Sequence, residues 1–194
     1  KALARLEHPN IVRLYNFGEE NGCFVLAMQF VEGQTFEDRI FAVGKVPWRD
    51  ACQVTIDILK ALEFAHGQNV IHRDIKPSNM LIQQDGTAMI MDFGIAKVTA
   101  DNSRLTATGQ TMGTVRYMSP EQVRGESVEK YTDIYSLGVS LYEAVVGDTP
   151  FDGSTHFEIM SKHLSEAPPS PRGRGADVPV TLERVLLRAL EKDP

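Results

Sequence analysis

One stretch of the sequence, with one residue further on, carries the side chains needed to transfer a phosphoryl group to a hydroxyl. Asp74 could orient an attacking hydroxyl and accept its proton, and Lys76 could offset the charge of the transferring phosphate. Asn79, and Asp92 thirteen residues later, offer the oxygen ligands that Mg²⁺ prefers when it holds nucleotide phosphates. Phosphoryl transfer depends on positioning and charge neutralisation more than on covalent help. These four residues are therefore the candidate site.

Two hairpins and one helix must position these side chains. Apolar residues at three- and four-residue steps predict a helix over 48–66. Apolar runs at 80–82 and 88–91, separated by an Asp-Gly pair, predict a β-hairpin directly after the catalytic stretch. Runs rich in β-formers at 11–17 and 24–31 predict a second hairpin, with its turn in the glycine-containing gap between them.

The remaining pattern is mainly helical, so the expected fold class is α+β. Residues 133–146 are apolar nearly all round, which is typical of a buried central helix. The other expected elements are the end of a helix at 1–7, a strand-like piece at 69–71, helices at 156–164 and 180–190, and loops at 99–114 and 167–179.

Composition limits the function classes. The chain has 194 residues, of which 42% are hydrophobic and 24% charged, as expected for one globular domain with a core. Its formal net charge of −6 offers no basic footprint for nucleic acid and no polybasic tether for lipid. No apolar run is long enough to cross a membrane, so we expect a cytoplasmic segment without membrane contact. Cys23 and Cys52 lie in apolar patterns and are expected to be buried thiols in a reducing compartment.

The catalytic stretch resembles a known family. Residues 72–79 read His-Arg-Asp-Ile-Lys-Pro-Ser-Asn and residues 92–94 read Asp-Phe-Gly, similar to the catalytic loop and metal-binding triplet of protein kinases. Ser119-Pro120-Glu121 resembles the family's Ala-Pro-Glu with one change. Segments 8–12, 133–138 and 189–194 resemble further family segments in the family's order. Together they identify the chain as a eukaryotic-type (Hanks-type) protein kinase, and the lysine two residues after the catalytic aspartate is the serine/threonine pattern. The wording of these segments is similar to bacterial members.

The resemblance implies an enzyme that transfers the γ-phosphate of ATP to Ser or Thr hydroxyls of protein substrates. It implies ATP and Mg²⁺, with Mn²⁺ as an alternative metal. It also implies a partial N-lobe at 1–30, a hinge at 31–35 and a mainly helical C-lobe at 36–194. The implied catalytic residues are Asp74, Lys76 and Asn79, with Asn79 and Asp92 as metal ligands. The implied nucleotide-binding residues are Met28, Gln29, Phe30, Val31, Lys76, Ser78, Asn79, Leu81 and Asp92.

Regulation is expected in the segment between Asp92 and Glu121, which resembles an activation loop. Thr106 and Thr108 occupy places that similar bacterial kinases phosphorylate on themselves, which would call for self-association of two copies. The phosphate could bridge Arg73 and Lys97, two cations for which the sequence shows no acidic partner. Thr114 would be a substrate-docking residue beside the catalytic aspartate. The alternative is that Thr106 and Thr108 are ordinary threonines of a flexible loop.

The chain is expected to be a catalytic domain truncated at both ends. The family's glycine-rich loop, nucleotide lysine and helix glutamate would precede Lys1, and the arginine partner of Glu121 would follow Pro194. The 194-residue chain alone is therefore expected to be inactive, and a membrane anchor of the parent protein could lie outside it. The alternative function is a pseudokinase or scaffold with the same fold, which the upstream residues would distinguish.

Overall fold

Two small antiparallel sheets and a group of helices make up the described part of the chain. The computed structural model describes residues 6–20, 23–93 and 112–193. The strands are β1 (Leu14–Glu20), β2 (Cys23–Met28), β3 (Gly33–Thr35), β4 (Met80–Gln83) and β5 (Ala88–Ile90). The helices are α1 (Phe36–Val43), α2 (Trp48–Gly67), the 3-10 turn η2 (Pro77–Asn79), α4 (Met112–Val115), α5 (Pro120–Arg124), α6 (Lys130–Val146), α7 (His156–Ser165) and α8 (Val180–Ala189). The expected α+β class is confirmed.

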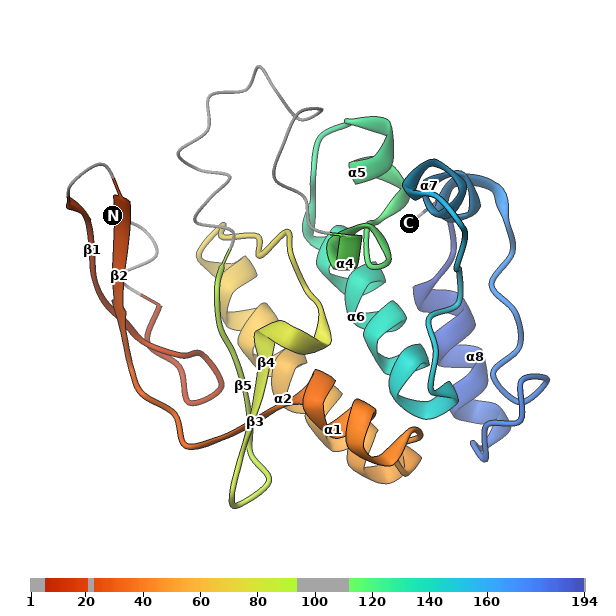
Figure 1. Cartoon of the computed structure of the whole chain (residues 1–194), viewed down its shortest axis with the longest axis horizontal. Coiled ribbons are helices and arrows are strands. Elements are labelled where there is room, and N and C mark those ends of the chain that lie inside the picture. The colour runs from red at the N-terminus through yellow and green to blue at the C-terminus, as the bar shows by residue number, and fades with distance from the viewer. Residues whose placement is uncertain (1–5, 21–22, 94–111, 194) are drawn as a thin grey trace.

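Both predicted hairpins form. Strand β1 pairs with β2, with Phe17 opposite Leu26, and this hairpin stands at one end of the molecule, away from most of the helices (Figure 1). The strand β1 continues to Glu20, so Gly18 lies inside the strand and not in the expected turn. Strand β4 pairs with β5 on one side and with β3 on the other, where Thr35 lies opposite Leu81. In the second sheet, the segment after β2 (strand β3) therefore pairs with the strand that follows the catalytic stretch (β4).

Helix α6 is the centre of the core. It packs against α2 and against α8, and most of its residues are buried because its sequence is apolar on nearly every side. Gly138 allows the close approach of α8, since a Cβ at this position would lie 3.0 Å from the Cβ of Ala189. Val139 and Tyr142 are completely buried. Burial of an apolar side chain such as that of Val139 stabilises the fold by about 1.5–3 kcal/mol.

Three local expectations are wrong. Residues 69–71 are not a strand: Asn69 has a left-handed φ of 58° and ends α2, with the amide of Val70 donating to the carbonyl of Ala65. Helix α4 occupies the end of the expected 99–114 loop and includes Thr114. Cys23 is exposed on its strand and Cys52 is only half-buried, so the two thiols are not both core residues.

Helix α1 was not expected at all. Its N-terminus carries a capping box in which the Thr35 side chain accepts from the amide of Asp38 and the Asp38 carboxylate accepts from the amide of Thr35. The Thr-x-x-Asp spacing is the sequence signal that marks this start. In the described part of the chain, no helix combines the length and the apolar character needed to cross a bilayer.

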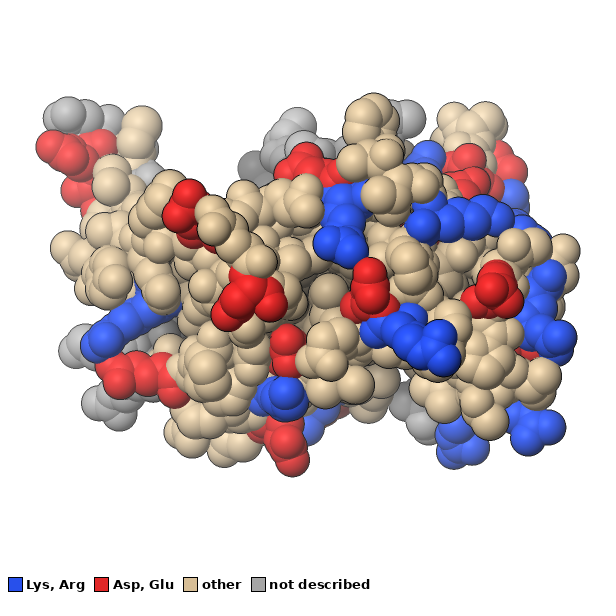
Figure 2. All heavy atoms as spheres, turned by 90° about the horizontal axis from the view of Figure 1, so that it is seen from below, with Lys and Arg blue, Asp and Glu red and all other residues tan. Residues whose placement is uncertain are grey.

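Charges of both signs are mixed over the face shown in Figure 2, where Lys and Arg lie among Asp and Glu. Some opposite charges form ion pairs, such as Arg39 with Asp50 at 3.0 Å and Arg116 with Asp152 at 2.9 Å. Exposed pairs of this kind each contribute about 0–1 kcal/mol.

Candidate functional site

A buried carboxylate at the start of α6 holds the catalytic stretch. Asp133 is completely buried, and its two oxygens accept hydrogen bonds from the backbone amides of His72 at 2.9 Å and Arg73 at 2.8 Å. The same carboxylate lies 2.7 Å from Nε2 of His66 on α2. These bonds hold Arg73 in a left-handed conformation with φ of 71°, which costs about 1–2 kcal/mol for a residue with a side chain. The segment between α2 and β4 is thereby fixed to the core.

His72 ties this segment to the end of β5. Its Nε2 lies 2.9 Å from the carbonyl oxygen of Met91, which can only accept, so Nε2 carries the proton. Nδ1 is then free to accept from the amide of Asp74 at 3.3 Å. Burial lowers the pKa of His72, consistent with this neutral tautomer. Its ring also contacts that of Phe93, with centroids 4.6 Å apart.

The predicted catalytic side chains lie together. Lys76 Nζ is 3.0 Å from Oδ2 of Asp74 and donates to Oγ1 of Thr114 at 3.1 Å. The side-chain amide of Asn79 donates to the Asp74 carbonyl at 2.8 Å and to its Oδ2 at 3.3 Å. The Asp74 carboxylate therefore contacts the ammonium group of Lys76 and the side-chain amide of Asn79, both from its own loop. Thr114 joins this group from α4, 38 residues away from Lys76.

Asn79 and Asp92 fit the donor set of a hard divalent cation. The amide of Met91 donates to the Asn79 carbonyl at 3.0 Å, which brings the chain just before Asp92 beside Asn79. Because the Asn79 amide nitrogen is bound to Asp74, its Oδ1 is the atom left for a cation. Asp92 is exposed and has a left-handed φ of 61°. Two oxygen donors from neighbouring segments suit Mg²⁺ better than a softer metal.

The predicted nucleotide-binding residues are more dispersed. Met28 ends β2 and is 38% exposed, and Phe30 is 90% exposed on the chain that leads to β3. The amide of Gln29 donates to the carbonyl of Arg13 at 2.8 Å, whereas Leu81 lies on β4. Val31 and Ser78 are half-buried.

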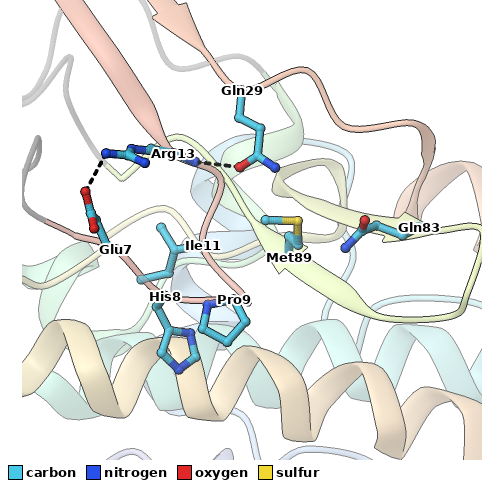
Figure 3. A pocket seen from close by; sticks show the side chains of 8 residues that line it. All are labelled: Glu7, His8, Pro9, Ile11, Arg13, Gln29, Gln83 and Met89. Atoms are coloured by element: carbon cyan, nitrogen blue, oxygen red, sulfur yellow. Dashed lines mark hydrogen bonds and ion pairs between the residues drawn. The ribbon is translucent and has the colours of Figure 1, made fainter.

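A cavity of about 280 Å³ opens beside the segment before β1, and Gln29 is the only predicted nucleotide residue in its lining (Figure 3). The lining residues are Glu7, His8, Pro9, Ile11, Arg13, Gln29, Gln83 and Met89. The cavity therefore contains none of the residues with predicted catalytic or metal-binding roles.

The predicted regulatory residues divide into two groups. Thr106, Thr108 and Lys97 lie outside the described residues. Arg73 is exposed, and its guanidinium forms no ion pair with a carboxylate of residues 6–20, 23–93 or 112–193.

Comparison with known proteins decides the family. The sequence pattern of the family described as "Protein kinase domain" matches residues 1–184. The chain belongs to the protein kinase family. It is 39% identical over 194 residues to the serine/threonine-protein kinase PrkC of Bacillus subtilis, covering 100% of this chain and 30% of PrkC. It is 39% identical over 195 residues to the serine/threonine-protein kinase PknB of Mycobacterium leprae, covering 98% of this chain and 31% of PknB.

A third relative, PknB of Mycolicibacterium smegmatis, is 41% identical over 196 residues, which is 98% of this chain and 31% of that protein. The chain thus spans about 30% of the length of the curated relatives it matches. The prediction of a Hanks-type kinase similar to bacterial serine/threonine kinases is confirmed. Protein kinases in general use ATP and a divalent metal ion.

Two contacts of this kinase chain were not predicted. Gln122 on α5 donates from Nε2 to the Arg73 carbonyl at 2.8 Å. Glu121, expected to pair with an arginine, accepts from the hydroxyl of Thr132. The Ser-Pro-Glu-Gln spacing signals only the capping box that starts α5. The bond from Gln122 to the catalytic loop spans 49 residues and has no local signal.

Proposed function

We propose that the whole protein is a serine/threonine protein kinase that transfers the γ-phosphate of ATP to Ser or Thr hydroxyls of protein substrates. The observation that carries this proposal is the group of side chains around the Asp74 carboxylate. Lys76 lies 3.0 Å from it, and Asn79 donates to both its carbonyl and its side chain. This arrangement suits a fixed base beside a fixed cation.

Asp74 is assigned the role of orienting the substrate hydroxyl and accepting its proton. Its side chain is 26% exposed, so a hydroxyl can reach it from solvent. Lys76 stabilises the negative charge that develops on the transferring phosphate, and Thr114 keeps the ammonium group in place through its 3.1 Å bond. Thr114 also docks the substrate, because it brings α4 next to the catalytic loop. Asn79 and Asp92 would hold Mg²⁺, or Mn²⁺, which neutralises phosphate charge when bound.

The remaining roles are those that the resemblance to protein kinases implies. Residues 1–30 form the nucleotide-facing lobe, 31–35 the hinge, and 36–194 the substrate-facing lobe. Met28, Gln29, Phe30, Val31 and Leu81 would line the adenine side of the site, with Ser78 near the phosphates. Support for the hinge comes from β3, which lies within residues 31–35 and pairs Thr35 with Leu81.

Phosphorylation of Thr106 and Thr108, by a second copy of the protein, would supply an anion for Arg73 and Lys97. Support comes from the guanidinium of Arg73, for which the described residues provide no carboxylate within ion-pair distance. Mass spectrometry of the whole protein after incubation with ATP should locate phosphate on these threonines. Unmodified Thr106 and Thr108 in an active enzyme would exclude this mode of regulation.

The test of the proposed function compares two Asp→Asn variants of the whole protein with Mg²⁺, ATP and a serine or threonine peptide. Asp74→Asn should lower kcat by about 10²–10⁴-fold, as expected for loss of a general base, with nucleotide binding largely kept. Asp85→Asn, in the exposed turn between β4 and β5, is the matched control and should leave kcat unchanged. A wild-type protein that binds ATP without transferring phosphate would instead indicate a scaffold.

A further inference from the structure

The side chain of Gln122 on α5 connects the backbone of Ser119 to the backbone of Arg73, the residue before the proposed base. Its Oε1 accepts from the amide of Ser119 at 3.1 Å, and its Nε2 donates to the Arg73 carbonyl at 2.8 Å. The amide of Ser119 can only donate and the carbonyl of Arg73 can only accept, so the two partners fix which end of the Gln122 amide is oxygen. The half-buried side chain thus uses both of its polar ends.

The carbonyl that Gln122 holds belongs to the peptide that carries the proposed base. The Arg73–Asp74 peptide is planar, so its carbonyl and its amide turn together. Gln122 holds the carbonyl at 2.8 Å, and Nδ1 of His72 accepts from the amide at 3.3 Å. The peptide before it is held by Asp133, which accepts from the amide of Arg73 at 2.8 Å. Gln122 is therefore the part of this support that comes from α5.

The backbone at Arg73 needs such support. Its φ of 71° lies in the left-handed region, which a residue with a side chain adopts only where its surroundings over-determine it. If the carbonyl is released, the peptide can rotate and carry the Asp74 carboxylate with it. Misplacement of a reacting group by about 1 Å can cost about 100-fold in rate.

We propose that Gln122 is a positioning residue that orients the Asp74 carboxylate through the Arg73 carbonyl, so that the order of α5 controls the rate of phosphoryl transfer. The proposal rests on the proposed function of Asp74 as the base. Gln122 itself touches no reacting atom. The competing explanation is that Gln122 only caps α5, because its side chain and that of Ser119 form a capping box.

Three variants of the whole protein separate these explanations. Gln122→Glu keeps the length and the acceptor for the Ser119 amide, but faces the Arg73 carbonyl with an oxygen that cannot donate. Gln122→Met keeps the approximate length without any hydrogen bond. Ser119→Ala is the control: it removes the hydroxyl that accepts from the Gln122 amide at 3.4 Å and leaves the bond to Arg73 in place.

The kinetic readout is the separation of kcat from KM. We expect Gln122→Glu and Gln122→Met to lower kcat by roughly 10- to 100-fold, with KM for ATP changed by less than about threefold. Ser119→Ala should lower kcat by less than about threefold. Equal losses in Ser119→Ala and the Gln122 variants would show that capping alone matters and would overturn the proposal. So would a wild-type kcat in both Gln122 variants.

Hydrogen exchange gives a readout that does not depend on activity. The amide of Asp74 should exchange faster in both Gln122 variants than in the wild type, and at the wild-type rate in Ser119→Ala. If the wild type transfers no phosphate and this difference is still found, the proposed function fails while the positioning role of Gln122 stands. If the wild type is active and neither exchange nor kcat responds to Gln122→Met, the positioning role alone is wrong.

Discussion

The catalytic loop and the β1–β2 hairpin lie on the same chain but are held in different ways. In the catalytic loop, the amides of His72 and Arg73 both donate to one completely buried carboxylate, that of Asp133. In the hairpin, six of the seven β1 residues are exposed and only Leu14 is half-buried. An isolated two-stranded hairpin is marginally stable in water. The comparison indicates that the helical part of the chain, and not the hairpin, fixes the groups proposed to act in catalysis.

The largest effect is expected at the anchor of the loop. Asp133→Ala leaves two backbone amides and His66 without their acceptor inside the core, which should lower the free energy of unfolding by about 3–5 kcal/mol. Urea denaturation of the 194-residue chain measures the change. Asp177→Ala, an exposed control in the loop before α8, should change it by less than about 0.5 kcal/mol. Equal losses of unfolding free energy in Asp133→Ala and Asp177→Ala would contradict the anchoring role of Asp133.

A buried histidine should make the helical part sensitive to acid. Burial, with the nearby Lys192 cation, lowers the pKa of His163 from 6.5 to about 4, and the ring is completely buried. Nδ1 of His163 lies 2.9 Å from the hydroxyl of Tyr135, and Nε2 lies 3.1 Å from the carbonyl of Arg116. Protonation would place a donor on Nδ1 and force the hydroxyl to turn away from it.

The sign follows from proton binding. Between pH 6.5 and pH 4 the unfolded chain binds a proton at His163 and the folded chain does not, so stability falls as the pH is lowered through this range. The full effect is about 3 kcal/mol. His163→Gln should flatten the pH dependence of the unfolding free energy by this amount, because it removes the titrating group. An unchanged slope in the variant would contradict the assignment.

Two Val→Ala changes compare the two regions directly. Val139 is completely buried on α6, whereas Val25 on β2 is 46% exposed. Val139→Ala should cost about 2–3 kcal/mol, because it removes buried methyl groups from a packed core. Val25→Ala should cost less than about 1 kcal/mol. Denaturation of both variants gives the two values, and a larger cost at Val25 would show that the hairpin contributes more than its exposure indicates.

An effect smaller than that of Val139→Ala is expected where α4 meets the catalytic loop. Thr114→Val keeps the shape of the side chain and removes the oxygen that accepts from Lys76 at 3.1 Å. In the whole protein we expect kcat to fall roughly tenfold, equivalent to about 1.4 kcal/mol. Thr114→Ser keeps the hydroxyl and should restore most of the rate. A Thr114→Ser variant as slow as Thr114→Val would mean that the hydrogen bond is not the reason.

Periodicity and turn residues predicted much of the fold. Helices α2 and α6 follow from apolar spacing, and the β4–β5 hairpin follows from Asp85-Gly86, because these signals are local. The sequence also indicated that Asp74, Lys76 and Asn79 act together, since they lie within six residues of one another.

Contacts between distant segments could not be predicted in this way. The bond from Gln122 to Arg73 spans 49 residues, and the bond from Lys76 to Thr114 spans 38. The left-handed backbone at Asn69 depends on how α2 ends, and the strand-like composition of 69–71 gave the wrong element. The exposure of Cys23 depends on which elements cover β2, which its apolar neighbours do not reveal.

Amide hydrogen exchange of the 194-residue chain tests the contrast between the two regions most directly. The amides of His72 and Arg73, bound to Asp133, should exchange only through global unfolding, whereas the β1–β2 amides should exchange by local opening, about 100-fold faster or more. Equal protection of the two sets would contradict the account, because the catalytic loop would then be no more firmly held than the hairpin.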